Sequence, residues 1–139
     1  MKLSRRDLAL LVPAVAAAQT PKAAPAKLAS TVYRYDELKV KETNGNKQRA
    51  VLDGLTHGGF AVELHMTELG PGLAPHAAHR HAHEEIVMIR RGELEVTIEG
   101  KVSRATAGSV VSVASNELHG WKNAGTEPAE YFVIALGKA

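Results

Sequence analysis

The feature that most restricts the fold of this chain is the alternation of apolar and polar side chains with a period of two. Alternate positions are apolar in two clear runs, which are Phe60, Val62, Leu64 and Met66, and then Leu94, Val96 and Ile98. Successive side chains of a β-strand point to opposite faces of a sheet, so this pattern predicts strands. No stretch after the N-terminal region shows a helical period.

Turn-forming residues separate these runs at hairpin distances. They fall at Gly58-Gly59, at Gly70 to Gly72, at Gly100-Lys101, at Ser115-Asn116 and at Gly125 to Pro128. A length of 139 residues suits a single core. Many short strands around one core predict an all-β antiparallel sandwich or barrel, and a jelly roll is one standard way to dispose of sheet edges.

The first eighteen residues are expected to be an export signal. Residues 1–6 are basic, residues 8–18 are apolar, and Ala16 to Ala18 form a small-residue run that a signal peptidase could cut. The segment Ser4 to Leu8 resembles a twin-arginine signal, whose pathway exports folded proteins. An ordinary secretory signal or an unprocessed tail stays open. The apolar run is shorter than the roughly 20 residues that cross a bilayer, so we expect a periplasmic or secreted protein without a stable membrane anchor.

Composition narrows the possible partners of the remaining chain. Residues 19–29 are rich in Ala, Pro and Lys and are expected to be a flexible linker, and residues 30–139 are expected to be the folded domain. Loss of residues 1–18 removes three basic residues and one acidic residue, so the net charge of +2 falls to zero. No basic stripe remains to bind nucleic acid. Cysteine is absent, so no disulfide stabilises the exported protein.

Four of the seven histidines lie close together, at His76, His79, His81 and His83, and Glu84 and Glu85 follow at once. On an extended strand His79 and His81 share one face, with backbones about 6.6 Å apart, so both could bind one ion. Glu85 would lie about 13 Å beyond His81 on the same strand, too far for a shared ion. The chain must therefore turn within residues 82–84 if Glu85 is to join them.

Two groups of residues resemble the two conserved motifs of the cupin superfamily. The first motif is matched by Gly72, His79, His81, Glu85 and Gly92, with one extra residue between Gly72 and His79. The second is matched by Gly108, His119 and Asn123. Ala114 and Asn116 stand where the family has proline and glycine, and Asn tolerates the left-handed turn conformation almost as well as Gly.

This resemblance implies a double-stranded β-helix, the cupin barrel, with one divalent transition metal in its mouth. The implied ion is Fe, Mn, Ni, Cu or Zn, and the implied ligands are His79, His81, Glu85 and His119. Asn123 would lie behind the ligands at most, and a homodimer is a family expectation. A histidine-rich surface loop, or a cupin with an unused site, is the alternative interpretation.

Other residues carry weaker predictions. We expect His83 to be a solvated loop residue, and His76 lies outside the motif. His65 could reach a pocket but is more readily explained as an ordinary strand histidine. Trp121, and after it Tyr131, could line the cavity or belong to the core or to a dimer interface. Three arginines could steer an anionic substrate or simply be solvated at strand edges: Arg80, Arg90 and Arg91.

These features favour a small periplasmic cupin enzyme that acts on a small organic molecule, with the metal as Lewis acid and with oxygenase chemistry slightly preferred. Three imidazoles and one carboxylate leave two positions of a six-coordinate ion free for water, oxygen or substrate. The pattern identifies no catalytic residue. The alternatives are a non-catalytic sensor or binding module for a small carboxylate or sugar, with a structural metal, and a purely structural dimer module.

Overall fold

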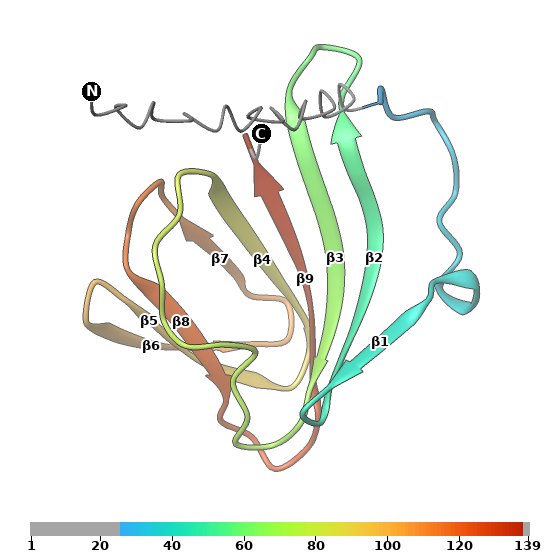
Figure 1. Ribbon diagram of the computed structural model, residues 1–139. Coiled ribbons are helices and arrows are strands. Elements are labelled where there is room, and N and C mark those ends of the chain that lie inside the picture. Colours follow the sequence, from blue (N-terminus) through green and yellow to red (C-terminus); the bar gives the residue numbers. More distant parts are fainter. Residues whose placement is uncertain (1–25, 138–139) are drawn as a thin grey trace, which may run out of the picture.

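The computed structural model describes residues 26–137 and is an antiparallel jelly roll, as predicted (Figure 1). The described residues form one short 3₁₀ helix and nine strands: η1 (Tyr35–Glu37), β1 (Val40–Thr43), β2 (Asn46–Leu55), β3 (Ala61–Leu69), β4 (Glu84–Arg91), β5 (Glu93–Ile98), β6 (Lys101–Thr106), β7 (Val110–Val113), β8 (His119–Asn123) and β9 (Ala129–Leu136). The expected export signal, residues 1–18, lies outside the described residues.

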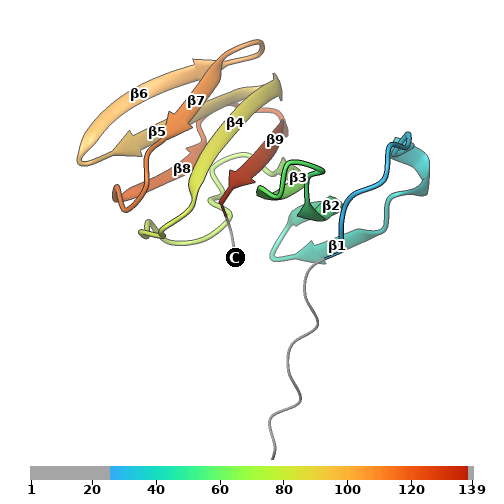
Figure 2. The same cartoon turned by 90° about the horizontal axis from the view of Figure 1, so that it is seen from above.

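The strands form a six-stranded sheet in the order β1-β2-β3-β9-β4-β7 and a three-stranded sheet in the order β6-β5-β8. From β4 onward the chain passes back and forth between the two sheets, which is the winding of a jelly roll. Figure 2 shows β4 and β9 between the three-stranded sheet on one side and β1 to β3 on the other. The core lies between the sheets and consists of Leu69, Val87, Ile89, Leu94, Val96, Ala105, Trp121, Ala129, Tyr131 and Val133.

The alternation in β5 is confirmed, since Leu94 and Val96 are buried and the residues between them are only half-buried. In β3 the apolar run does not provide the core face. Instead Thr67 and Leu69 point inward, paired with Tyr131 and Ala129 of β9. The outer face of β3 is covered as well, by Tyr33, Tyr35 and Leu38 around Met66. Because both faces of this strand are covered, polarity alone does not reveal which face is inside.

Part of the expected flexible linker is bound to the sheet. The amide of Leu28 donates to the carbonyl of Leu55 at 2.8 Å, and the amide of Leu55 donates to the carbonyl of Ala26 at 3.0 Å. Residues 26–28 therefore extend the edge of β2, whereas residues 19–25 lie outside the described chain. No helix within residues 26–137 is long and apolar enough to cross a membrane.

Gly92 joins β4 to β5 and is required there for two reasons. Its φ of +82° is left-handed, and a Cβ atom at this position would lie 2.7 Å from the Cα of Ala129. We expect Gly92→Ala to lower the free energy of unfolding by roughly 2 to 5 kcal/mol, from left-handed strain plus overpacking. Urea denaturation followed by circular dichroism measures this loss.

Gly59 provides the matched control for this substitution. Its φ is +86°, but no atom lies within 4 Å of the place that an alanine methyl group would take, so Gly59→Ala carries the strain without the clash. We expect it to cost only about 1 to 2 kcal/mol. Equal losses in the two variants would contradict the close approach of β9 to Gly92.

Candidate metal centre

Three chain segments bring the candidate ligands together. His79 and His81 lie in the loop before β4, Glu85 lies in β4, and His119 begins β8. A pair of backbone hydrogen bonds, each 3.0 Å long, joins His79 to His119 across the gap between loop and strand. The chain bends at Ala82 and His83, where the sequence required a turn for Glu85 to approach the histidines.

The four candidate side chains lie together at the edge of the core, where His81 and His119 both contact Glu85 and both also lie beside His79. Nε2 of His81 lies 3.3 Å from Oε1 of Glu85, and Nε2 of His119 lies 3.4 Å from Oε2 of Glu85. The ring centroid of His79 lies 5.1 Å from that of His81 and 4.9 Å from that of His119. His119 is 1% exposed and Glu85 is 9% exposed, so solvent screens these contacts little.

Backbone carbonyls fix the protonation of two of the rings. Nδ1 of His81 donates to the carbonyl of His83 at 2.8 Å, and Nδ1 of His119 donates to the carbonyl of Glu117 at 2.9 Å. A carbonyl only accepts, so the proton of each neutral ring lies on Nδ1. Both Nε2 atoms therefore carry a lone pair, and both are directed at the carboxylate of Glu85.

These acceptor atoms have no hydrogen-bond donor among the described residues. The buried atoms without a partner include Nδ1 of His79, Nε2 of His81, Oε2 of Glu85 and Nε2 of His119. Acceptors facing acceptors at 3.3 to 3.4 Å repel one another unless a cation or a proton lies between them. Two donors that each stand about 2.1 Å from one ion are about 3.0 to 3.4 Å apart. The cluster could therefore bind a divalent transition ion.

The electrostatic surroundings favour neutral histidine at this place. The pKa of His79 is lowered from its ordinary value, first by burial and then by the neighbouring imidazoles of His76, His119 and His81. A proton on His79 would be repelled by any of these neighbouring imidazoles that also became protonated. His79 therefore stays unprotonated at neutral pH, which is the form that binds a metal.

His83 differs from the prediction of a solvated loop residue. Its side chain is only 17% exposed, and its ring stacks on that of His81 with centroids 3.6 Å apart and planes 5° apart. Its Nε2 lies 3.4 Å from Oε1 of Glu85, so His81, His83 and Glu85 form a second group of possible donors. The prediction relied on the turn at residues 82–83, and this turn is present but holds the ring of His83 against that of His81 instead of directing it to solvent. Because the stacked rings are nearly parallel, however, their lone pairs do not converge on one ion.

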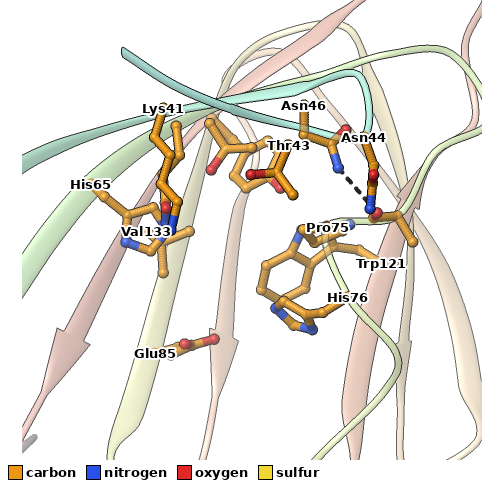
Figure 3. Close-up of a pocket in the computed structure, with 14 residues that line it drawn as sticks. Lys41, Thr43, Asn44, Asn46, His65, Pro75, His76, Glu85, Trp121 and Val133 are labelled. Carbon is orange, nitrogen blue, oxygen red and sulfur yellow. Dashed lines mark hydrogen bonds between the residues drawn. The ribbon is translucent and has the colours of Figure 1, made fainter. Parts of the chain in front are cut away.

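A cavity of about 320 Å³ lies beside this cluster, with Glu85 in its wall (Figure 3). Its other lining residues are Lys41, Thr43, Asn44, Asn46, Gln48, His65, Thr67, Ala74, Pro75, His76, Trp121, Tyr131 and Val133. Trp121 and Tyr131 thus belong both to the core and to the cavity wall.

Two further histidines line this cavity, contrary to the weaker predictions for them. His76 packs edge-on against His79, with ring centroids 4.4 Å apart. His65 lies on the inner face of β3, where its Nδ1 is 3.0 Å from Oε1 of Glu63. The inverted burial of β3 explains the second case, because His65 shares its face with Leu69 and not with the apolar run.

The arginines considered for substrate steering do not line the cavity, and each has a carboxylate partner. Arg80 binds Glu99 and also donates to the carbonyl of Asn116 at 2.6 Å. Arg90 and Arg91 both bind Glu130. They therefore belong to solvated ion pairs at the surface, in agreement with the alternative interpretation.

The residues on one side of the cavity were not predicted from the sequence. Five polar residues from the β1–β2 hairpin line it, although they precede both motifs: Lys41, Thr43, Asn44, Asn46 and Gln48. Only the pairing of β1 with β2 and of β2 with β3 carries this hairpin to the cavity. No local pattern of residues reports such a placement.

Comparison with known proteins agrees with this architecture. The sequence profile described as "Cupin domain" matches residues 65–135. Among solved structures, the chain is similar to an RmlC-like cupin from Shewanella frigidimarina, with 16% identity, a TM-score of 0.66, and coverage of 79% of this chain and 93% of that one. It is also similar to a predicted oxalate decarboxylase from Thermotoga maritima, with 23% identity, a TM-score of 0.64, and coverage of 78% and 100%.

A third similar structure is the polyketide cyclase RemF from Streptomyces resistomycificus, with 16% identity, a TM-score of 0.65, and coverage of 80% of this chain and 81% of that one. No curated protein sequence matches the chain. At these identities the structural neighbours establish the fold and leave the reaction open.

Proposed function

Because this chain belongs to the cupin family, we propose that it is a metal-dependent enzyme that acts on a small organic molecule in the periplasm. His79, His81, Glu85 and His119 would hold one divalent ion of Fe, Mn, Ni, Cu or Zn. We favour oxygenase-like or other Lewis-acid chemistry. The periplasmic location rests on the sequence of residues 4–8, and cell fractionation of the full-length protein tests it.

One observation carries the proposal: buried lone pairs from three chain segments face one another without a donor between them. Four protein donors of this kind leave coordination positions open to a ligand. When bound, such an ion supplies Lewis acidity and, if it is redox-active, an electron as well. The adjoining cavity supports access of a small molecule to these positions.

A proton acceptor is available on the same sheet face as Glu85, two strands away on β3. Nδ1 of His65 donates to the carboxylate of Glu63 at 3.0 Å, which leaves Nε2 of His65 as the basic atom. A carboxylate behind an imidazole fixes its tautomer and stabilises the charge that it gains on taking a proton. His65 would therefore accept a proton from a substrate that is bound in the cavity.

The alternative function is a non-catalytic small-molecule sensor or binding module with a structural metal. The position of His83 beside Glu85 is the observation that favours it. If the ring of His83 rotated to join the other four donors, a six-coordinate ion would keep only one open position. Such a site would suit a structural role better than catalysis.

The decisive experiment combines elemental analysis of the untagged full-length protein with oxygen uptake on phenolic and carboxylic compounds. We expect about one redox-active ion per chain and measurable turnover. One zinc per chain without turnover would support the binding module instead. Less than a tenth of an ion per chain, even after dialysis against each candidate metal, would refute both.

Comparison of His81→Ala with His83→Ala distinguishes four protein donors from five. We expect His81→Ala to lower metal affinity by about 100-fold, because loss of a direct ligand should exceed the 10- to 100-fold cost of losing a supporting contact. His83→Ala should lower it by only about tenfold, because the stacked ring supports His81 and does not point at the ion. Isothermal titration with Zn²⁺ measures both, and the exposed His57→Ala is the control. Equal losses would make His83 a ligand.

A further inference from the structure

We propose that the cavity binds a small organic anion, with its carboxylate on Lys41 and its other oxygen-bearing end at the metal. This inference rests on the proposed function, because the ion holds one end of the molecule. To that function it adds the charge of the substrate and the residue that recognises this charge.

Lys41 is placed to bind an anion. It lies in β1, opposite Gln48 of β2, and both residues line the cavity. Lys47, on the neighbouring strand β2, is by contrast paired with Glu68 at 3.1 Å. Lys41 has no carboxylate partner within residues 26–137, so its positive charge is available to a ligand.

The distribution of charge around the cavity points the same way. Among the lining residues that the structure describes, Glu85 is the carboxylate, and a bound divalent ion would more than neutralise it. Figure 3 shows Lys41 and Glu85 reaching the cavity from different strands. Although Glu63 lies behind His65, a molecule that fills the cavity would meet the ion at one end and the ammonium group of Lys41 at the other, and these two positive groups favour an anion.

Two buried donors also await an acceptor in this cavity. Nε1 of Trp121 and the hydroxyl of Tyr131 are buried and make no well-aligned hydrogen bond among the described residues, although the hydroxyl lies beside Trp121 and Thr67. Burial raises the pKa of Tyr131 to about 12, so its hydroxyl keeps its proton. Buried donors without partners are costly, and an oxygen-rich ligand would satisfy both.

The size of the cavity limits the ligand. A volume of about 320 Å³ lies at the lower end of the range of roughly 300 to 1,000 Å³ that is usual for ligand pockets. The lining is mixed, because amides and hydroxyls from the β1–β2 hairpin face the aromatic side chains of β8 and β9. A compact molecule with an apolar middle and oxygen atoms at both ends fits this lining.

The test uses a pair of probes that differ only in the remote charge. The probes are 3,4-dihydroxybenzoate and 3,4-dihydroxybenzamide, which share a chelating end, and they are titrated calorimetrically into full-length protein loaded with Zn²⁺. Zinc is not redox-active, so the probes are not consumed. We expect the acid to bind about tenfold or more tightly than the amide, as for a hydrogen bond to a charged group.

Two variants test whether Lys41 causes the tighter binding of the acid. In Lys41→Met the acid and the amide should bind within about twofold of each other, whereas Lys39→Met, which changes a nearby exposed lysine outside the cavity, should keep the full preference. Retention of the preference in Lys41→Met would overturn the inference. The inference would also be overturned if the wild-type protein bound the acid and the amide equally or bound neither of them.

The number of Zn²⁺ ions bound per chain in the same samples distinguishes failure of the anion site from failure of the proposed function. One Zn²⁺ per chain without discrimination refutes only the anion site. Without stoichiometric Zn²⁺, the proposed function fails and this inference fails with it.

Discussion

The substitution Glu85→Gln is expected to lower the affinity for a divalent ion by about 100-fold or more. Glu85 is the one anionic donor of the cluster, and its two oxygens face Nε2 of His81 and of His119 at 3.3 and 3.4 Å. Loss of contacts that merely support a ligand already costs roughly 10- to 100-fold, so loss of the charged ligand itself should cost at least the upper figure. Isothermal titration with Zn²⁺ or Co²⁺ at neutral pH measures the change.

The same substitution should not destabilise the metal-free protein. In the wild type, acceptor atoms of Glu85 and the two imidazoles face one another without a donor. The amide of Gln supplies that donor, so the free energy of unfolding should stay equal or rise by about 1 kcal/mol. Urea denaturation in the presence of a chelator measures it. The variant would then be more stable without metal and less stable with it, which is the signature of a binding site.

Glu84→Gln is the matched control, because this substitution makes the same chemical change at an exposed position one residue before Glu85. It should alter neither metal affinity nor stability by a measurable amount. Unchanged metal affinity in Glu85→Gln would contradict the metal centre. If ligand binding and activity were unchanged as well, the purely structural dimer module would be the better interpretation.

The substitution Asn123→Ala is expected to lower the free energy of unfolding by about 3 to 5 kcal/mol. Asn123 is 1% exposed, and its side chain connects the end of β3 to the turn between β8 and β9. Its Nδ2 donates to the carbonyls of Leu69 and Glu127, each at 2.8 Å, and its Oδ1 accepts from the amide of Gly125 at 2.9 Å. Alanine would leave these buried groups without partners.

Such a loss is a large fraction of the roughly 5 to 15 kcal/mol that stabilises a typical domain. Thermal and urea denaturation measure it. The control is Asn46→Ala, which removes a single exposed hydrogen bond of 3.3 Å to the carbonyl of Ala74 and should cost less than about 1 kcal/mol. Similar costs in both variants would contradict this role. Asn123 therefore closes the end of the jelly roll, and it contacts none of the four metal-ligand candidates through these bonds.

Much of the fold could be predicted from local patterns. The alternation at Leu94 and Val96 is reproduced in β5, and Asn116 adopts the positive φ of +63° that its place in the turn required. The turn at residues 82–83, which the spacing of His81 and Glu85 demanded, is present as well. The place of His119 among these residues followed from the resemblance to the cupin motifs and not from local spacing. Whether they hold a metal stays a prediction.

Local sequence patterns were enough to predict a β-rich domain and the turn that returns Glu85 to His81, because strand parity and turn residues act over a few positions. The inner face of β3 could be identified only from the folded chain, and with it the place of His65 in the cavity. The tertiary structure alone stacked His83 on His81 and carried Lys41 to the cavity wall. These placements depend on the pairing of strands far apart in the chain and on which faces other segments cover. Short-range sequence patterns contain neither.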